Sequence, residues 1–366
     1  ATIERRVIRW LCELVGLPQS ADGVFLGGGS LANLTALSVA TSRTLGKDFR
    51  RMGIAGAAGG KRAVIVCSTE THFSIQRAAA MLGIGTDNIV AVDTDDQHRM
   101  CPRSLANQLK TDDTVLCVVA SAGSTTTGAV DPLVEIADLC DTHATWLHVD
   151  AAYGAAGLLA EELRPVFQGI ERADSVTMDL HKWFFTAIDN SVLLYRDPGA
   201  ARDLFFENSD YIHFPVDGPP EQHMFFHLGP ELSRRFRAFP AMLSFCHYGA
   251  EALGRNVYHN VECARYLGDL IAYHDSLEMV AAPQLSIVNF RYAAKNCSDA
   301  EVDLINQKIR EAIEHSGQFL MSVTQLNGRP VLRVCIVNHA TRADHVDQLV
   351  EQVLALGRKF SREICG

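Results

Sequence analysis

TWLHVDAAYGAAGLLAEELRPVFQGIERADSVTMDLHK, the stretch from residue 145 to residue 182, decides which fold this chain of 366 residues is expected to adopt. Its apolar runs at 145–149 and 175–178 predict two strands, and the segment 154–167 between them predicts a helix. Strands that are apolar throughout are typical of parallel sheets with both faces covered. The stretch therefore predicts a strand–helix–strand unit of an α/β protein.

The same alternation extends along most of the chain. Further strands are expected at 63–67, 89–92, 114–120 and 191–195, and further helices at 2–16, 31–43, 75–82, 101–109 and 132–141. Short strands that alternate with helices favour a large mixed, mostly parallel sheet. We therefore expect a large α/β domain over residues 1–240.

The pattern changes after residue 198. Residues 210–230 are rich in Pro, His and Phe and include the turn signal Asp217-Gly218-Pro219-Pro220, which predicts a mobile loop at about 207–230. A long helix is expected at 241–272, strands at 285–292, 319–326 and 331–338, and helices at 299–315 and 342–359. These elements predict a smaller C-terminal α+β domain over residues 241–366.

Composition narrows the class of protein. Hydrophobic residues make up 48% of the chain and charged residues 21%, as in ordinary globular proteins. The net charge of −10 argues against nucleic acid as a partner. No apolar run reaches about 18 residues, so we expect no transmembrane helix and no membrane partner. The start Ala1-Thr2-Ile3 lacks both a signal-peptide pattern and an initiator Met, so a trimmed or partial chain is expected.

The cysteines indicate a reducing compartment. The chain has ten of them, without any CxxC pair, and most lie in apolar stretches. This spacing predicts reduced core cysteines in a cytoplasmic protein, with no disulfide framework and no metal site.

Two motifs early in the chain suit an anion and a flat ring. Gly27-Gly28-Gly29-Ser30 precedes an expected helix, where backbone N–H groups and the Ser30 hydroxyl could bind a phosphate. Taken alone, it is better explained as a turn in which Ser30 caps the helix. His72 follows the strand at 63–67, where its imidazole could stack on a ligand ring. Taken alone, it is better explained as a solvated loop histidine.

Two further motifs belong to the opening stretch. Asp150 ends an apolar strand, where a carboxylate could pair with a protonated pyridine nitrogen, although taken alone it is better explained as the N-cap of the next helix. Lys182 follows the next strand among bulky apolar residues, and desolvation there would lower the pKa of an amine that forms a Schiff base. A lone lysine near a strand end is usually exposed and inert.

Taken together, the four motifs are better explained by one shared cofactor than by four separate structural roles. They supply a phosphate cradle, a stacking imidazole, an acid for a pyridine nitrogen and a Schiff-base lysine in successive strand–helix units. The interval of 32 residues from Asp150 to Lys182 suits one helix and one strand. These are the parts that pyridoxal 5′-phosphate (PLP) requires, so PLP is the expected cofactor.

The chain resembles the group II PLP-dependent amino acid decarboxylases, which include aromatic, tyrosine, glutamate and 2,4-diaminobutyrate decarboxylases. The resemblance covers essentially the whole chain. It rests on the segments 28–34, 123–126, 148–153 and 174–183, and on His72. It implies fold type I, the aspartate-aminotransferase-like architecture, and decarboxylation of an L-amino acid to its amine and CO2, with an aromatic substrate slightly favoured.

The resemblance also implies a role for individual residues. Lys182 would hold the cofactor, Asp150 would bind the pyridine nitrogen, and His72 would stack on the ring and take part in catalysis. The residues that would hold the phosphate or surround the ring are Gly29, Ser30, Thr125, Ala152 and His181.

Two positions bear on the reaction and the substrate. Tyr211 lies 29 residues after Lys182, where aromatic decarboxylases place a loop tyrosine that protonates the substrate carbon, and relatives with Phe there are aldehyde synthases. By itself Tyr211 is one residue of an aromatic-rich loop. Asp179 stands where aromatic decarboxylases have Asn and diaminobutyrate-type members have Asp, and we expect it to hydrogen-bond His181.

The family also carries an N-terminal segment that swaps between subunits and that this sequence does not include. Family members are dimers, so a homodimer is expected. The alternatives are another fold-type I reaction (an aldehyde synthase, a lyase or an aminotransferase) or a non-catalytic regulator with the same fold. A Rossmann dehydrogenase is disfavoured because the chain lacks the dinucleotide fingerprint.

Overall fold

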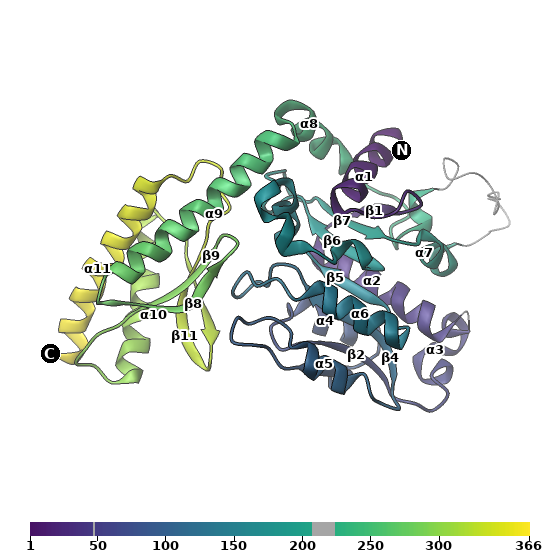
Figure 1. Cartoon of the computed structure of the whole chain (residues 1–366), viewed down its shortest axis with the longest axis horizontal. Helices are drawn as coiled ribbons and strands as arrows, with labels where there is room; N and C mark the ends of the chain where they lie inside the picture. Colours follow the sequence, from purple (N-terminus) through teal and green to yellow (C-terminus); the bar gives the residue numbers. More distant parts are fainter. Residues whose placement is uncertain (47, 207–223) are drawn as a thin grey trace. The chain divides into compact units, whose positions relative to one another are not determined.

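Residues 1–46, 48–206 and 224–366 are described by the computed structural model of the chain, and they divide into two compact units. Unit 1 comprises residues 1–124 and 130–254, and unit 2 comprises residues 125–129 and 255–366. Figure 1 shows the elements of each unit. The sequence predicts one domain over residues 1–240 and a second over residues 241–366, and that division into folding domains stays a prediction.

Unit 1 is built on a seven-stranded sheet with the order β1-β7-β6-β5-β4-β2-β3. The strands are β1 Asp22–Leu26, β2 Ala63–Ser68, β3 Ile89–Val92, β4 Thr114–Ser121, β5 Leu147–Asp150, β6 Ser175–Asp179 and β7 Ser191–Tyr195. The five strands from β6 to β3 pair in parallel, whereas β7 is antiparallel to both β6 and β1. This is the expected mixed, mostly parallel sheet, and β2, β5, β6 and β7 are buried along their whole length.

The helices of unit 1 follow the strands in the expected alternation. They are α1 Thr2–Val15, α2 Gly29–Leu45, α3 Phe49–Ala57, α4 Ser74–Met81, α5 Pro102–Gln108, α6 Leu133–His143, α7 Pro198–Phe205 and α8 Ala238–Tyr248. Helix α2 packs across the strands from β4 to β7, so its inner face lies over the centre of the sheet. The strand β1 and the helices α3 and α7 were not expected from the sequence.

Two of the expected helices are wrong in form. The segment 154–167 forms two short 3₁₀ helices, Gly154–Leu159 and Glu161–Phe167, which are separated by the extended backbone of Ala160. Pro165 lies inside the second and lacks the N–H that an α-helix would use. The long helix expected at 241–272 is two helices, α8 and α9 Ala250–Tyr273. They are separated by Gly249, whose φ of 78° is left-handed.

Unit 2 is an α+β structure, as expected. Its antiparallel sheet has the order β10-β11-β9-β8, with β8 Leu277–Gln284, β9 Ile287–Tyr292, β10 Ser322–Leu326 and β11 Arg329–Cys335. Helices α10 Asp299–Ser316 and α11 Ala343–Cys365 pack with it, together with most of α9. Ser298 and Glu301 form a capping box that begins α10.

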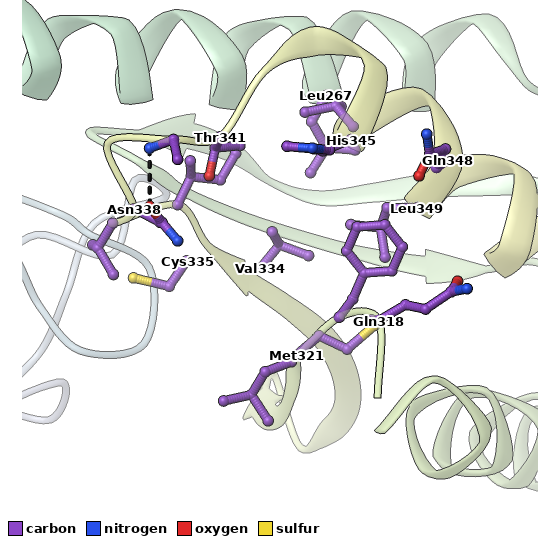
Figure 2. A pocket seen from close by; sticks show the side chains of 16 residues that line it. Leu267, Gln318, Met321, Val334, Cys335, Asn338, Thr341, His345, Gln348 and Leu349 are labelled. Atoms are coloured by element: carbon purple, nitrogen blue, oxygen red, sulfur yellow. Dashed lines mark hydrogen bonds between the residues drawn. The ribbon is translucent and has the colours of Figure 1, made fainter. Parts of the chain in front are cut away.

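Unit 2 also has a cavity of about 730 Å³ that is open to solvent (Figure 2). Apolar side chains from α9, the segment before β10, β11 and α11 line much of it, including Leu267, Met321, Val334 and Leu349. Its polar lining residues are Gln318, Asn338, Thr341, His345 and Gln348.

The expectation that every cysteine is reduced is wrong for two of them. Cys297, just before α10, and Cys365, at the end of α11, form a disulfide with 5.6 Å between their Cα atoms. They are 68 residues apart, and only the packing of the two helices brings them together. The other eight cysteines are free, five of them buried.

Among the described residues, every helix is either too short or too polar to span a bilayer.

Candidate functional site

The predicted site residues converge at the carboxyl ends of the strands of unit 1. Asp150 is the last residue of β5, His72 lies between β2 and α4, and Lys182 lies three residues past the end of β6. Strand β1 runs in the same direction as β6 because both are antiparallel to β7. The glycine-rich turn that leads from β1 into α2 therefore lies at this same edge, which is where ligands of open α/β sheets bind.

Asp150 is held by two hydrogen bonds. Its Oδ2 accepts from the side-chain amide of Asn33 at 2.7 Å, and its Oδ1 accepts from the backbone N–H of Ala152 at 3.1 Å. The residue is 9% exposed. Its orientation is therefore set from two sides, and a carboxylate has further lone pairs for a ligand N–H.

His72 is half-buried beside this acid. Its Nδ1 lies 2.8 Å from Oγ of Ser74 and 3.3 Å from the backbone N of Ser74. Burial lowers the pKa of His72, and the carboxylates of Asp150 and Asp179 oppose that shift. The ring is therefore disposed to be neutral at pH 7 and to present a flat face.

Lys182 makes an ion pair with Asp179. Its Nζ lies 2.9 Å from Oδ2 of Asp179, whose side chain is 2% exposed and whose Oδ1 also accepts from the Ser191 hydroxyl. The expected burial of the lysine among apolar residues is wrong. Its side chain is 42% exposed, because the turn after β6 directs Trp183 and Phe184 inward instead.

His181 does not have the expected partner. Its Nδ1 lies 3.0 Å from the backbone oxygen and 3.1 Å from the backbone N of Asn190, while its Nε2 is 3.8 Å from Asp179. Asp179 is thus bound more closely to Lys182 than to His181.

The turn before α2 packs closely on the same carboxylate. Gly28 has a φ of 154°, and a Cβ built on Gly29 would lie 2.8 Å from Oδ2 of Asp179. Lys182 and Gly29 therefore lie against the same carboxylate. Ser30, in the first turn of α2, is exposed and available to a ligand.

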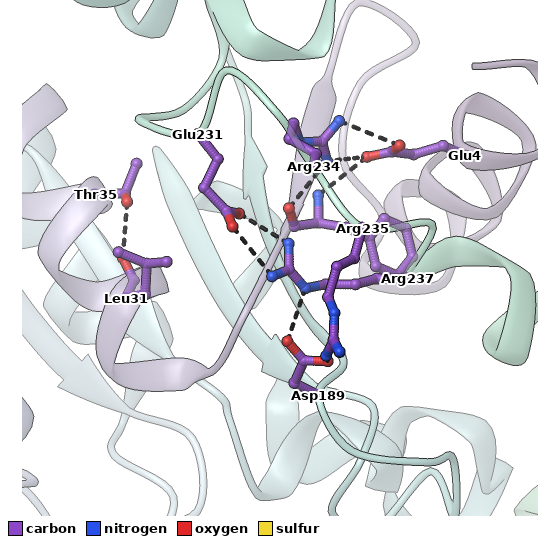
Figure 3. Close-up of polar contacts among 9 residues, drawn as sticks. Glu4, Leu31, Thr35, Asp189, Glu231, Arg234, Arg235 and Arg237 are labelled. Carbon is purple, nitrogen blue, oxygen red and sulfur yellow. Dashed lines mark hydrogen bonds and ion pairs between the residues drawn. The ribbon is translucent and has the colours of Figure 1, made fainter.

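Buried ion pairs hold the segment 231–237 beside this turn (Figure 3). Arg237 pairs with Glu231 at 2.9 Å and with Asp189 at 3.2 Å, and Arg234 pairs with Glu4. A Cβ on Gly27 would lie 3.2 Å from Nη2 of Arg237, so this guanidinium packs directly on the glycine-rich turn.

Two predicted site residues are not brought to this edge by the described structure. Thr125 is exposed and groups with unit 2, so its contact with a ring stays a prediction. Tyr211 lies outside the described residues. Ala152 is buried two residues after Asp150, and the next residue, Tyr153, stacks on Trp183 with 5.1 Å between ring centroids.

Three polar residues of the site had no role predicted from the sequence. Asn33 and Ser74 connect Asp150 and His72 through hydrogen bonds, and His148 bonds to Asn33. Asn33 stands inside the motif at 28–34. The only signal for it was a polar residue at a position on α2 where the neighbouring residues are apolar or small.

The arrangement fits the predicted cofactor. A carboxylate with free acceptor capacity, a flat neutral imidazole, a lysine amine and the glycine-rich start of a helix all lie at one edge of one sheet. PLP needs these same groups for its pyridine nitrogen, its ring face, its aldehyde and its phosphate.

Comparisons with known proteins agree with this geometry. A model described as the pyridoxal-dependent decarboxylase conserved domain matches residues 1–293. The aromatic-L-amino-acid decarboxylase of Bacillus atrophaeus is 36% identical over 98% of this chain and 74% of its own length. The L-2,4-diaminobutyrate decarboxylase of Rhizobium meliloti is 32% identical over 98% of this chain and 70% of its own length. The crystal structure of mouse CSAD in apo form matches with a TM-score of 0.89 and 28% identity, over 97% of this chain and 76% of that one.

Proposed function

The chain belongs to the family of pyridoxal-dependent decarboxylases, and from this premise we propose that its substrate is an aromatic L-amino acid and that Lys182, Asp150 and His72 hold its cofactor. As a member of this family the chain is a PLP-dependent carboxy-lyase that acts on an amino acid. Its mixed sheet with a smaller α+β unit is the type I fold.

The observation that carries the assignment of site residues is the convergence on Asp150. The acid that ends β5 is fixed by Asn33 and Ala152 and lies at the edge that also carries His72 and Lys182. A buried carboxylate held in one orientation is what a protonated pyridine nitrogen needs as a partner. A surface lysine and an N-cap aspartate with no common ligand would have no reason to converge in this way.

Each residue of the site has a separate task in the proposed reaction. When bound, PLP supplies an electron sink for the pair of electrons that the departing carboxylate leaves behind. Lys182 binds the cofactor through Nζ, and Asp179 holds that Nζ in place. Asp150 keeps a proton on the pyridine nitrogen through its own negative charge. His72 covers one face of the ring.

The start of α2 and Tyr211 complete the proposal. Gly29 and Ser30 bind the phosphate with His181 close by, while Ala152 and Thr125 line the ring. The Tyr211 hydroxyl delivers a proton to the substrate Cα after CO2 leaves. The role of Tyr211 rests on its spacing from Lys182 alone, since it lies outside the described residues.

Two observations bear on the substrate. The relative named as an aromatic-L-amino-acid decarboxylase is 36% identical to this chain, against 30% and 32% for two relatives named as L-2,4-diaminobutyrate decarboxylases. The position of Tyr211 also favours an aromatic substrate. Asp179 supports 2,4-diaminobutyrate as the second candidate, because diaminobutyrate-type members have Asp at this place.

An amino acid panel tests the substrate. CO2 release from L-Tyr, L-DOPA, L-Trp, L-Phe, L-Glu and L-2,4-diaminobutyrate is measured with PLP added, and amine, aldehyde and H2O2 are quantified. We expect kcat/KM for at least one aromatic substrate to exceed that for diaminobutyrate by about tenfold or more, the value of one good pocket contact. The reverse order would replace the aromatic proposal with diaminobutyrate. Aldehyde and H2O2 in place of amine would indicate an aldehyde synthase.

We also propose a homodimer, because members of the family that this chain resembles are dimers. We propose a cytoplasmic location because eight of the ten cysteines are free. Light scattering coupled to size-exclusion chromatography tests the first. A mass of one chain, about 40 kDa, at micromolar concentration would overturn it.

A further inference from the structure

Asn33 lies at the centre of a buried hydrogen-bond network that the reaction described above does not use. It is 1% exposed on the inner face of α2. Its amide nitrogen donates to Oδ2 of Asp150 at 2.7 Å and to Oγ of Ser74 at 2.9 Å, and its Oδ1 lies 3.1 Å from Nε2 of His148. One side chain therefore connects the acid after β5 with two histidines.

The charge of Asp150 fixes which way the Asn33 amide points. A carboxylate only accepts hydrogen bonds, so the NH2 group of Asn33 must face it and the amide oxygen must face the other way, toward His148. The reversed amide would place its oxygen against the carboxylate oxygen and leave two buried acceptors without a donor.

The amide oxygen in turn fixes the proton on His148. Because Oδ1 of Asn33 can only accept, Nε2 of His148 must carry a hydrogen. Nδ1 of His148 is then free to accept from the Ser175 hydroxyl at 2.9 Å, and that hydroxyl oxygen accepts from the Trp146 indole N–H at 3.0 Å. Burial lowers the pKa of His148 to about 4, which agrees with a neutral ring.

The second N–H of Asn33 fixes the proton on His72 in the same way. Oγ of Ser74 accepts from Asn33 and lies 2.8 Å from Nδ1 of His72, to which the Ser74 hydroxyl can donate. The Ser74 backbone N–H points at the same nitrogen from 3.3 Å. Nδ1 of His72 is therefore an acceptor, and the hydrogen of the neutral ring is on Nε2.

We propose that Asn33 is a positioning residue that orients the Asp150 carboxylate with one N–H and, through Ser74, sets the Nε2–H tautomer of His72 with the other. The bearing of these two residues on catalysis rests on the proposed function, whereas the direction of each hydrogen bond does not. All bonds of the network then run one way, from Trp146 through Ser175 and His148 to Asn33, and from Asn33 to Asp150 and His72.

Histidine NMR tests the proposal without the cofactor. The chain is labelled with ¹⁵N-histidine, and two-bond ¹H–¹⁵N spectra report which ring nitrogen carries hydrogen; substitution of each histidine assigns its signals. At pH 7.5 we expect both His72 and His148 as the Nε2–H tautomer. A hydrogen on Nδ1 of either ring would overturn the proposal.

The variant Asn33→Leu removes every hydrogen bond of this side chain with little change in volume. We expect mixed tautomers for His148 and His72 and a rise in the dissociation constant for PLP of about tenfold or more, the usual effect of losing a hydrogen bond to a charged group. Thr41→Val on the same helix is the matched control, since within the described part of the chain the buried Thr41 hydroxyl donates to the backbone oxygen of Leu37 of α2, and it should change neither quantity. Unchanged tautomers and PLP affinity in Asn33→Leu would overturn the proposal.

If Asn33→Leu does not fold, the variant Ser74→Ala tests the same proposal with a smaller change to the core. Ser74→Ala cuts the branch to His72 and leaves Asn33 on Asp150 and His148. We expect the Nε2–H population to fall for His72 alone, because only the longer 3.3 Å bond from the backbone N–H of residue 74 then remains on its Nδ1, with restoration in Ser74→Thr. A change at His148, or none at His72, contradicts the proposal. A wild-type chain that shows the expected tautomers but binds no PLP would instead overturn the proposed function.

Discussion

The strand-end edge of unit 1 and the cavity of unit 2 are lined by different chemistry. The edge gathers Asp150, His72, Lys182 and Asp179, each of which makes a hydrogen bond or ion pair of 2.7–2.9 Å. The cavity has a volume of about 730 Å³, yet among its lining residues, all within the described part of unit 2, there is no Asp, Glu, Lys or Arg. Space alone does not identify a reaction site, whereas convergent groups with fixed protonation do.

The substitution Lys182→Ala tests most directly whether the strand-end edge, and not the cavity, is the reaction site. Without the amine no covalent link to the cofactor can form, so we expect kcat to fall by at least about 10³-fold and the absorbance near ~420 nm to disappear on titration with PLP. Lys110→Ala, an exposed lysine of the same unit, should keep both. Retained turnover in Lys182→Ala would remove the strand-end edge as the reaction site.

A second test measures how the free energy of unfolding depends on pH, which reports whether His148, next to the strand-end edge of unit 1, is held neutral. Burial lowers the pKa of this histidine from 6.5 to about 4 in the folded chain, so between these values the unfolded chain binds more protons. The stability it provides is complete above pH 6.5 and is lost as the pH falls toward 4, by about 2 kcal/mol between pH 7 and pH 5.

A variant is needed to isolate this contribution. Burial raises the pKa of Asp131 to about 6, which changes stability in the opposite sense over part of the same range. His148→Gln keeps Asp131. From urea unfolding at pH 7 and pH 5, we expect the wild type to lose about 2 kcal/mol more than this variant. Equal losses would mean that His148 is not held neutral in the folded chain.

Gln348→Ala should have the smallest effect. Gln348 is an exposed residue of α11 that lines the cavity of unit 2. We expect kcat/KM within about twofold of the wild type and a free energy of unfolding within about 0.5 kcal/mol, as for most surface substitutions. A large fall in kcat/KM with unchanged stability would show that the cavity contributes to the reaction.

Local patterns in the sequence predicted most of the large sheet. Continuous apolar runs identified all of its strands except β1, whose five residues follow a turn and carry a glycine at their second position. The long helix expected across Gly249 failed because the apolar pattern continues through a residue whose backbone is left-handed. Periodicity reports which face of a segment is buried, and it is insensitive to a single change of backbone conformation.

Part of the site could also be predicted from local patterns in the sequence. Asp150, His72 and Lys182 were identifiable because each follows a strand, and parallel strands end at one edge. The close pairing of Lys182 with Asp179 rather than with an apolar shell was not, since it depends on the direction of the turn after β6.

By itself the sequence determined the alternation of strands and helices, the position of each reactive residue at a strand end, and the family. Only the tertiary structure decided that Asn33 joins Asp150 across 117 residues, and that Cys297 meets Cys365 across 68. Local propensity and periodicity act over a few residues and can be read from the chain. Contacts between distant residues form only when helices and sheet pack together, so no short stretch of sequence contains them.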